Sequence, residues 1–248
     1  MFRGLVTAFR TLSVLPIPGR ESGKMSQSLP WFPLVGFTLG LIVFGAALGV
    51  KYVTNDAWPE GCAVFLLLTG VVLTRGLHLD GIADWADGFF GAADRDGALR
   101  IMKDPRTGAF GVIALVTILL AKWAALARIA ACGSLQWIVV AYVVSRTAQV
   151  DLATAQPYAR SEGGTGAAFV GTAGWRHLAI ALALAVLLLA SFCGFDSQWV
   201  ASLLAGLLIS RLFGIYCRHR VGGVTGDLLG ANSEIVETII LAAGAVLT

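Results

Sequence analysis

The chain has 248 residues, of which 57% are hydrophobic and only 13% are charged, and its mean hydropathy is +0.79. Soluble domains carry charged residues at about twice that frequency. The composition therefore excludes an ordinary soluble protein and predicts an integral membrane protein. The formal net charge is +3, and no basic segment is interleaved with aromatic residues, so the sequence does not predict a nucleic-acid partner.

Six apolar runs are long enough to cross a bilayer, which takes about 20 mostly apolar residues. They lie near residues 31–50, 58–75, 109–131, 135–153, 177–194 and 198–217. A seventh span exists if the final run, 235–248, begins inside the polar segment before it. No repeat or low-complexity linker divides the chain. We therefore predict an all-α, polytopic membrane bundle of six or seven helices, formed by a single domain over residues 1–248.

The basic residues predict which connections face the cytoplasm. Thirteen Lys and Arg residues lie in the N-terminal segment and in three long connections, 75–108, 154–176 and 218–234, whereas the alternate connections hold two. Lys and Arg are enriched on the cytoplasmic side of membrane proteins, so these four segments are predicted to be cytoplasmic. Most acidic residues lie there too, which favours chemistry at the cytosolic face over a transport path.

The stretch HLDGIADWADG, residues 78–88, places three carboxylates on one face of a predicted helix over 79–92. At about 100° per residue, Asp80, Asp84 and Asp87 project in similar directions. Neighbouring carboxylates beside an apolar span repel one another, and a bound cation removes that cost. Oxygen-only ligation suits a hard divalent ion, so we predict a Mg²⁺ or Mn²⁺ site. The alternative is a solvated helix face, which the apolar residues between the carboxylates disfavour.

A second acidic segment, GGVTGDLLGANSEIVE, has a similar spacing. Asp227, Glu234 and Glu237 fall on one helical face, and the glycine-rich turn before them can present backbone N–H groups to a phosphate. We predict that Asp227 and Glu234 belong to the metal site. The alternative is a glycine-rich loop followed by a capped helix.

Two further loops supply candidate contacts to a phosphate or a nucleotide. In IMKDPRTGAFG, Lys103 and Arg106 can neutralise phosphate oxygens, and Asp104 can join the metal shell. In YARSEGGTGAAF, Arg160 and the 161–166 loop are candidates for contact with a nucleotide, with a flexible linker as the alternative. The predicted substrate-binding residues are His78, Lys103, Arg106, Arg160 and Asn232.

Taken together, HLDGIADWADG, IMKDPRTGAFG and GGVTGDLLGANSEIVE, with TLSVLPIPGR and FPLVGFTLG near the N-terminus, resemble the cobalamin synthase family, also called adenosylcobinamide-GDP ribazoletransferases. The resemblance covers essentially the whole chain, in order. It implies a multi-pass enzyme of the bacterial or archaeal inner membrane, and the charge pattern puts its active site on the cytoplasmic side. The implied reaction, with Mg²⁺ present, joins adenosylcobinamide-GDP to α-ribazole, or to α-ribazole 5′-phosphate, and releases GMP.

The resemblance also implies roles for the predicted residues. The carboxylates that would hold Mg²⁺ against the GDP diphosphate are Asp80, Asp84 and Asp87, with Asp227 and Glu234 for a second ion or the opposite wall. The side chains that would bind phosphate oxygens are Lys103 and Arg106. The catalytic carboxylate that accepts the proton of the attacking ribose hydroxyl is left open among Asp87, Asp104 and Glu237. Homo-oligomerisation is left open as well.

Two other functions compete with this interpretation. A CDP-alcohol phosphotransferase also uses an Asp-rich helix, but its usual motif has an Ala-Arg pair soon after the first Asp-Gly. Here Asp80-Gly81 is followed by Ile82-Ala83-Asp84, without that arginine. A cation transporter would place carboxylates deep within its spans, and only Asp151 comes close to such a position.

Overall fold

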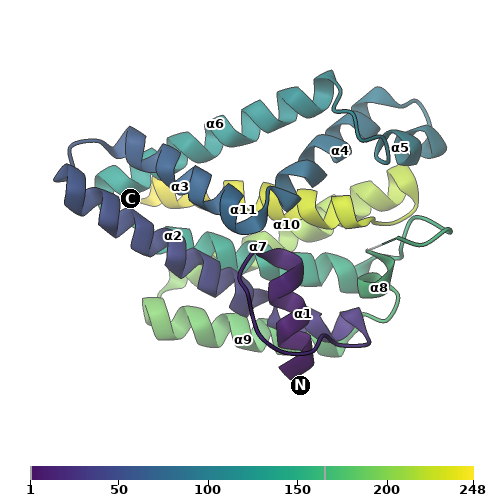
Figure 1. Ribbon diagram of the computed structural model, residues 1–248, viewed down its shortest axis with the longest axis horizontal. Helices are drawn as coiled ribbons and strands as arrows, with labels where there is room; N and C mark the ends of the chain where they lie inside the picture. Colours follow the sequence, from purple (N-terminus) through teal and green to yellow (C-terminus); the bar gives the residue numbers. More distant parts are fainter. Residues whose placement is uncertain (1, 165) are drawn as a thin grey trace.

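The computed structural model describes residues 2–164 and 166–248, and these ranges fold into helices with one isolated β-bridge and no strand. The helices are α1 (Phe2–Leu12), the 3-10 helix η1 (Met25–Trp31), α2 (Phe32–Thr54), α3 (Pro59–Thr74), α4 (Leu77–Gly91), α5 (Arg95–Ile101), α6 (Ala109–Cys132), α7 (Gln136–Ala155), α8 (Ala167–Val170), α9 (Trp175–Cys193), α10 (Ser197–Val221) and α11 (Gly226–Leu247). The prediction of an all-α chain is confirmed (Figure 1).

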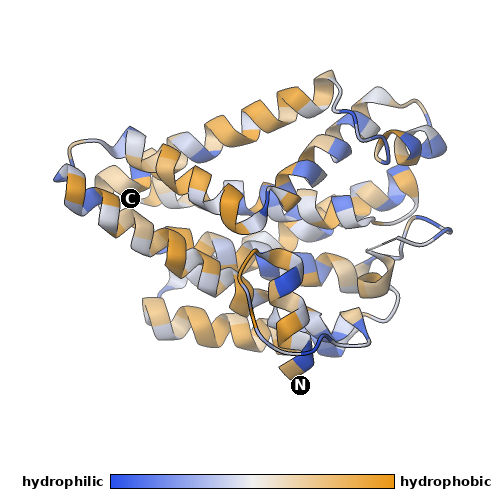
Figure 2. Ribbon diagram, viewed as in Figure 1, coloured by the Kyte–Doolittle hydropathy of each residue, from blue (hydrophilic) through white to orange (hydrophobic). Residues whose placement is uncertain are grey.

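Five helical segments of the described ranges are long and apolar enough to cross a membrane. They are η1 with α2, α6, α9, α10 and α11, and the bent pair of α3 and α4 is a sixth if it counts as one span. Figure 2 shows apolar residues along most of α2, α3, α6 and α9, with polar residues gathered toward one end of the bundle. This is the polytopic membrane bundle that the composition predicts.

The long, basic connections lie together at one end of that bundle. In Figure 1, the turns that follow α4, α7 and α10 lie at the right with α5 and α8, whereas the turns joining α2 to α3, α6 to α7 and α9 to α10 lie at the left with the C-terminus. The charge difference between these alternate connections is therefore a charge difference between the two ends of the bundle, whereas the basic N-terminal segment with α1 lies between the ends (Figure 1).

The apolar run at 135–153 forms α7, but it is not one of the lipid-facing spans. Its composition is too polar to count among the five. It packs against α2, α9, α10 and α11, and every residue from Trp137 to Ala153 is buried. The polar side chains of Arg146, Gln149 and Asp151 therefore contact protein instead of lipid, which removes the cost of facing the bilayer.

The last helix begins earlier than the hydropathy suggests. We predicted a connection over 218–234, but α10 continues to Val221 and α11 begins at Gly226, so the acidic segment lies within the helix. Thr225 caps α11, since its hydroxyl accepts a hydrogen bond from the Leu228 N–H at 3.3 Å. The run at 235–248 is thus the second half of a 22-residue helix, long enough to span the bilayer.

A sharp break between α3 and α4 sets the direction of the acidic helix. Arg75 and Gly76 both have positive φ, 56° and 65°, a backbone conformation that ends an α-helix. The two helices meet at 90°. This break lets α4 leave the direction of α3 and pack along α11 and α6. The predicted helix over 79–92 is therefore confirmed as α4.

Helices α4 and α11 pack backbone to backbone at Gly81. A Cβ atom at this position would lie 2.4 Å from the carbonyl oxygen of Asp227 and 3.1 Å from the amide nitrogen of Ala231. Only glycine permits so close an approach. The contact brings Asp80 and Asp84 of one helix beside the first turn of the other, where Asp227 lies.

We expect Gly81→Ala to push the two helices apart and to destabilise the protein, because overpacking of such a contact costs about 1–3 kcal/mol. Gly91→Ala is the matched control on the same helix, since its Cβ would meet neighbours only at 3.8 and 3.9 Å. Thermal unfolding in detergent should show a lower midpoint for Gly81→Ala alone. Equal midpoints for the two variants would contradict the close packing.

Candidate active site

Three carboxylates meet where α4 packs on the start of α11. Asp80 is exposed, and Asp84 and Asp227 are half-buried. Asp80 and Asp84 lie within one helical turn of Gly81, which packs against the backbone of Asp227, and Asp80 and Asp227 line one cavity. Among the described residues, these three carboxylates form one ion pair, between Asp227 Oδ2 and Arg160 Nη2 at 3.2 Å. The junction therefore carries more negative than positive charge.

Arg160 links the carboxylates to a cationic cavity of about 350 Å³. The basic residues that line this cavity are Arg95, Arg100, Lys103 and Arg160. Arg95 is held in place by two backbone carbonyls, since its Nε donates to Val221 O and its Nη2 to Ala159 O, each at 2.9 Å. A positively charged cavity of this size suits a phosphate-bearing ligand.

Lys103, a predicted phosphate contact, lines this cavity, but it has a partner. Its Nζ donates to Glu162 Oε2 at 2.7 Å, and this ammonium lowers the pKa of the Glu162 carboxyl below its ordinary value. Both side chains are well exposed. An incoming phosphate would compete with Glu162 for Lys103. Residue 165, within the 161–166 loop that we predicted near the nucleotide, lies outside the described residues.

Asp104 and Arg106 form a local pair instead of joining the carboxylates. Arg106 donates from Nε and Nη2 to the two oxygens of Asp104, at 2.9 and 2.7 Å, and its side chain is 87% exposed. These hydrogen bonds lower the pKa of Asp104 to about 2. The carboxylate therefore keeps its charge until the pH falls to about 2, which makes it a poor proton acceptor at neutral pH.

Asp87 contacts the start of α6. It is buried, and its two oxygens accept hydrogen bonds from the backbone N–H groups of Gly108 and Gly111, at 2.6 and 2.8 Å. Free N–H groups at a helix N-terminus need such acceptors. Asp87 therefore anchors the beginning of α6 in this structure. Its role as a metal ligand or a base stays a prediction, which these hydrogen bonds disfavour.

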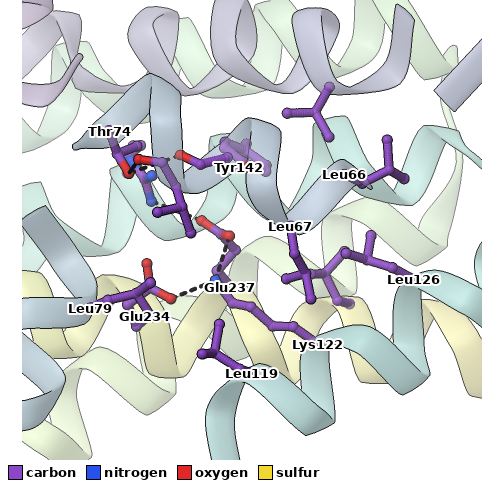
Figure 3. A pocket seen from close by; sticks show the side chains of 15 residues that line it. Leu66, Leu67, Thr74, Leu79, Leu119, Lys122, Leu126, Tyr142, Glu234 and Glu237 are labelled. Atoms are coloured by element: carbon purple, nitrogen blue, oxygen red, sulfur yellow. Dashed lines mark hydrogen bonds and ion pairs between the residues drawn. The ribbon is translucent and has the colours of Figure 1, made fainter. Parts of the chain in front are cut away.

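Glu234 and Glu237 belong to a buried ion-pair cluster (Figure 3). Lys122 Nζ donates to Glu234 Oε2 and, at 2.7 Å, to Glu237 Oε1, while Arg146 Nη1 lies 3.0 Å from Glu237 Oε2. None of the four side chains is more than 7% exposed. The two cations and two anions neutralise one another. This pairing disfavours the metal role of Glu234 and the proton-acceptor role of Glu237, both of which stay predictions.

Lys122 was overlooked in the sequence, although a signal for it was available. It lies in the middle of the predicted span 109–131. A cation at that depth requires a buried anion, and the acidic residues at the beginning of the last apolar run, Glu234 and Glu237, are the available partners. The buried carboxylate of Asp151 is likewise paired with a cation, since its Oδ1 lies 2.6 Å from Arg211 Nη2.

The last two predicted substrate contacts differ in their surroundings. Asn232 is fully buried, and its amide nitrogen donates to Ala148 O at 3.1 Å, so it ties α11 to α7. The predicted role of Asn232 in substrate binding stays a prediction, and this packing disfavours it. His78 instead lines a cavity of about 250 Å³ together with Asp80 and Asp227.

The carboxylates at the α4–α11 junction are suited to a hard cation, although they do not form a closed cage. Within residues 2–164 and 166–248, no group of three or more His, Cys, Asp or Glu side chains forms a ready-made metal cluster. Mg²⁺ usually needs none, because one or two carboxylates hold it while substrate phosphates and water complete its shell. Asp84 and Asp227, beside a cationic cavity, fit that mode of binding.

The chain is similar to one family over nearly its whole length. The family model described as cobalamin-5-phosphate synthase matches residues 4–245. Proteins named adenosylcobinamide-GDP ribazoletransferase from Chlorobaculum parvum and Chlorobaculum tepidum are 51% and 50% identical, each over 97% of this chain and 94% of the relative. The one from Syntrophobacter fumaroxidans is 40% identical over 98% of this chain and 97% of its own. No solved structure matches the chain.

Proposed function

Because the chain belongs to the cobalamin-5-phosphate synthase family, we propose that the α4–α11 carboxylates and the cationic cavity form the site at which adenosylcobinamide-GDP reacts with α-ribazole or its 5′-phosphate. The function is that of an adenosylcobinamide-GDP ribazoletransferase in cobalamin biosynthesis. The observation that carries the site is the close contact at Gly81, which brings Asp80 and Asp84 beside Asp227.

The donor diphosphate binds between the cations and the carboxylates. Arg160, Arg100 and Lys103 line the cavity that receives it, and Arg160 also contacts Asp227. Mg²⁺ held by Asp84 and Asp227 would neutralise the diphosphate and the charge that develops on the leaving phosphate. The guanidinium of Arg160 orients the phosphate oxygens by directional hydrogen bonds.

The transfer requires a nucleophile, a leaving group and a proton acceptor. A ribose hydroxyl oxygen of the acceptor attacks the phosphorus of the phosphate attached to cobinamide. The bond from that phosphorus to the oxygen of GMP breaks, and GMP leaves with the electron pair. We assign the hydroxyl proton to Asp80, the exposed carboxylate that borders cavities on both sides of α4. Asp87 and Glu237 are already occupied, as described above.

The charged end of the bundle is proposed to face the cytoplasm of a bacterial inner membrane. The asymmetry of Lys and Arg supports this orientation, and it gives water-soluble nucleotides access to the site. A large amphiphilic corrinoid substrate gives a reason for catalysis at a membrane surface. The deep carboxylates of Asp151, Glu234 and Glu237 are paired with cations, and no observation favours a transport path.

An activity assay tests this function directly. The protein, purified in detergent or nanodiscs, is given adenosylcobinamide-GDP and α-ribazole with Mg²⁺ or with EDTA. We expect equal amounts of GMP and a cobalamin with Mg²⁺, neither with EDTA, and recovery on adding excess Mg²⁺. Full activity in EDTA would contradict the metal site, and GMP release without a cobalamin would contradict the transfer.

A further inference from the structure

A second cavity shares the active-site carboxylates but has a different chemistry. It measures about 250 Å³ and is enclosed by α1, α2, α4, α7, α8 and α11. The α4–α11 wall contributes His78, Asp80 and Asp227, and α7 contributes Gln149. The apolar residues of the lining are Leu12, Phe32, Leu77, Phe169 and Leu229. The cavity therefore extends from Asp80 and Asp227 into a region lined by aromatic and aliphatic side chains.

Two buried polar side chains in this cavity have atoms without hydrogen-bond partners. His78 is 1% exposed and Gln149 is 3% exposed. In the part of the chain that the structure describes, both ring nitrogens of His78 and the Oε1 of Gln149 lack a hydrogen-bond partner. Gln149 Nε2 donates to Leu229 O at 3.2 Å, which holds the amide in place. Each buried group left unpartnered costs about 1–3 kcal/mol, so the pair indicates a ligand that supplies the missing hydrogen bonds.

The lining also restricts the class of ligand. No described Lys or Arg lines this cavity, whereas two carboxylates do, so it disfavours a phosphate and suits an uncharged group. Phe32 and Phe169 lie with ring centroids 6.1 Å apart, which offers an aromatic surface to a planar ring. A volume near the lower limit of small-molecule pockets, about 300 Å³, accommodates a bicyclic heterocycle and not a corrinoid.

We propose that this cavity binds the uncharged heterocyclic base of the acceptor nucleoside. The base packs against Phe32 and Phe169, and its free ring nitrogen accepts a hydrogen bond from an N–H of His78. The Oε1 of Gln149 accepts a hydrogen bond from a ribose hydroxyl of the same nucleoside. Its ribose then lies toward Asp80, where the attacking hydroxyl is needed. This assignment rests on the proposed function, and it separates the acceptor from the donor nucleotide, which occupies the cationic cavity.

Steady-state kinetics with each substrate varied in turn test the assignment. Gln149→Leu keeps the size of the side chain and removes its hydrogen bonds, and we expect it to raise the KM for α-ribazole about tenfold, with the donor KM changed less than twofold. Gln156→Leu is the matched control. It also has a buried, unpartnered Oε1 and lies at the end of α7, but it does not line this cavity. Its two KM values should match those of the native protein.

A second variant and a binding measurement distinguish this inference from the proposed function. Phe169→Trp fills the cavity from α8, and it should weaken acceptor binding while leaving the donor KM unchanged. Without donor, α-ribazole should raise the unfolding temperature of the native protein and not that of Gln149→Leu. If the native protein forms a cobalamin but the acceptor KM is unchanged in both cavity variants, the assignment is overturned and the function stands. Loss of the reaction in the native protein would overturn the function itself.

Discussion

Asp84→Asn is expected to slow the release of GMP about 10³-fold or more. The substitution keeps the shape of the side chain and removes the charge that would bind Mg²⁺. A metal ion contributes several kcal/mol of charge stabilisation in the transition state, and each 1.4 kcal/mol changes the rate about tenfold. In the described ranges Asp84 carries no ion pair like those of Asp227 or Glu234, so the variant should fold normally. The measurement is kcat at saturating concentrations of both substrates over a Mg²⁺ titration.

Asp56→Asn is the control for this experiment. Asp56 is an exposed carboxylate in the turn between α2 and α3, 2.7 Å from Lys51, and it lies outside the α4–α11 junction and both proposed substrate cavities. Its removal should change kcat by less than twofold, at every Mg²⁺ concentration. If Asp84→Asn retained the native rate and the native Mg²⁺ dependence, the metal site would have to lie elsewhere in the molecule.

Lys122→Met should cause the largest loss of stability of any variant considered. It removes one of two cations from a buried cluster that also holds Glu234 and Glu237, and an uncompensated anion remains. Breaking a buried ion pair in this way costs about 3–5 kcal/mol. For a chain of this length, that loss lowers the midpoint of thermal unfolding by about 10 °C. Differential scanning fluorimetry in detergent measures it.

The double variant Lys122→Met/Glu234→Gln tests the cause. It removes one cation and one anion, so the cluster is again neutral, and most of the lost stability should return. The result also separates a structural role from a catalytic one. A Lys122→Met protein with native stability but an altered Mg²⁺ requirement would return Glu234 to the metal site, as its spacing in the sequence first suggested.

The sequence alone predicts the class of fold and the acidic face of α4. The composition and the apolar runs of about 20 residues predict a bundle of membrane-spanning helices, because such helices satisfy their own backbone hydrogen bonds within the bilayer. The distribution of Lys and Arg predicted which connections share an end, and the structure places them there. The period of the α-helix places Asp80 and Asp84 on one side of α4, and the sequence motifs alone indicate the family.

What the sequence determined was the direction of each carboxylate around its helix, and what only the tertiary structure decided was the neighbour that each one meets. Residues seven positions apart share a helix face but lie about 10 Å apart along the axis, far beyond the 2.1 Å reach of a magnesium ligand. Asp80 therefore borders the junction while Asp87 meets the start of α6. Asp227 likewise meets α4, whereas Glu234 meets Lys122. Helical periodicity carries no information about depth, so packing alone decided which carboxylates remained free for chemistry.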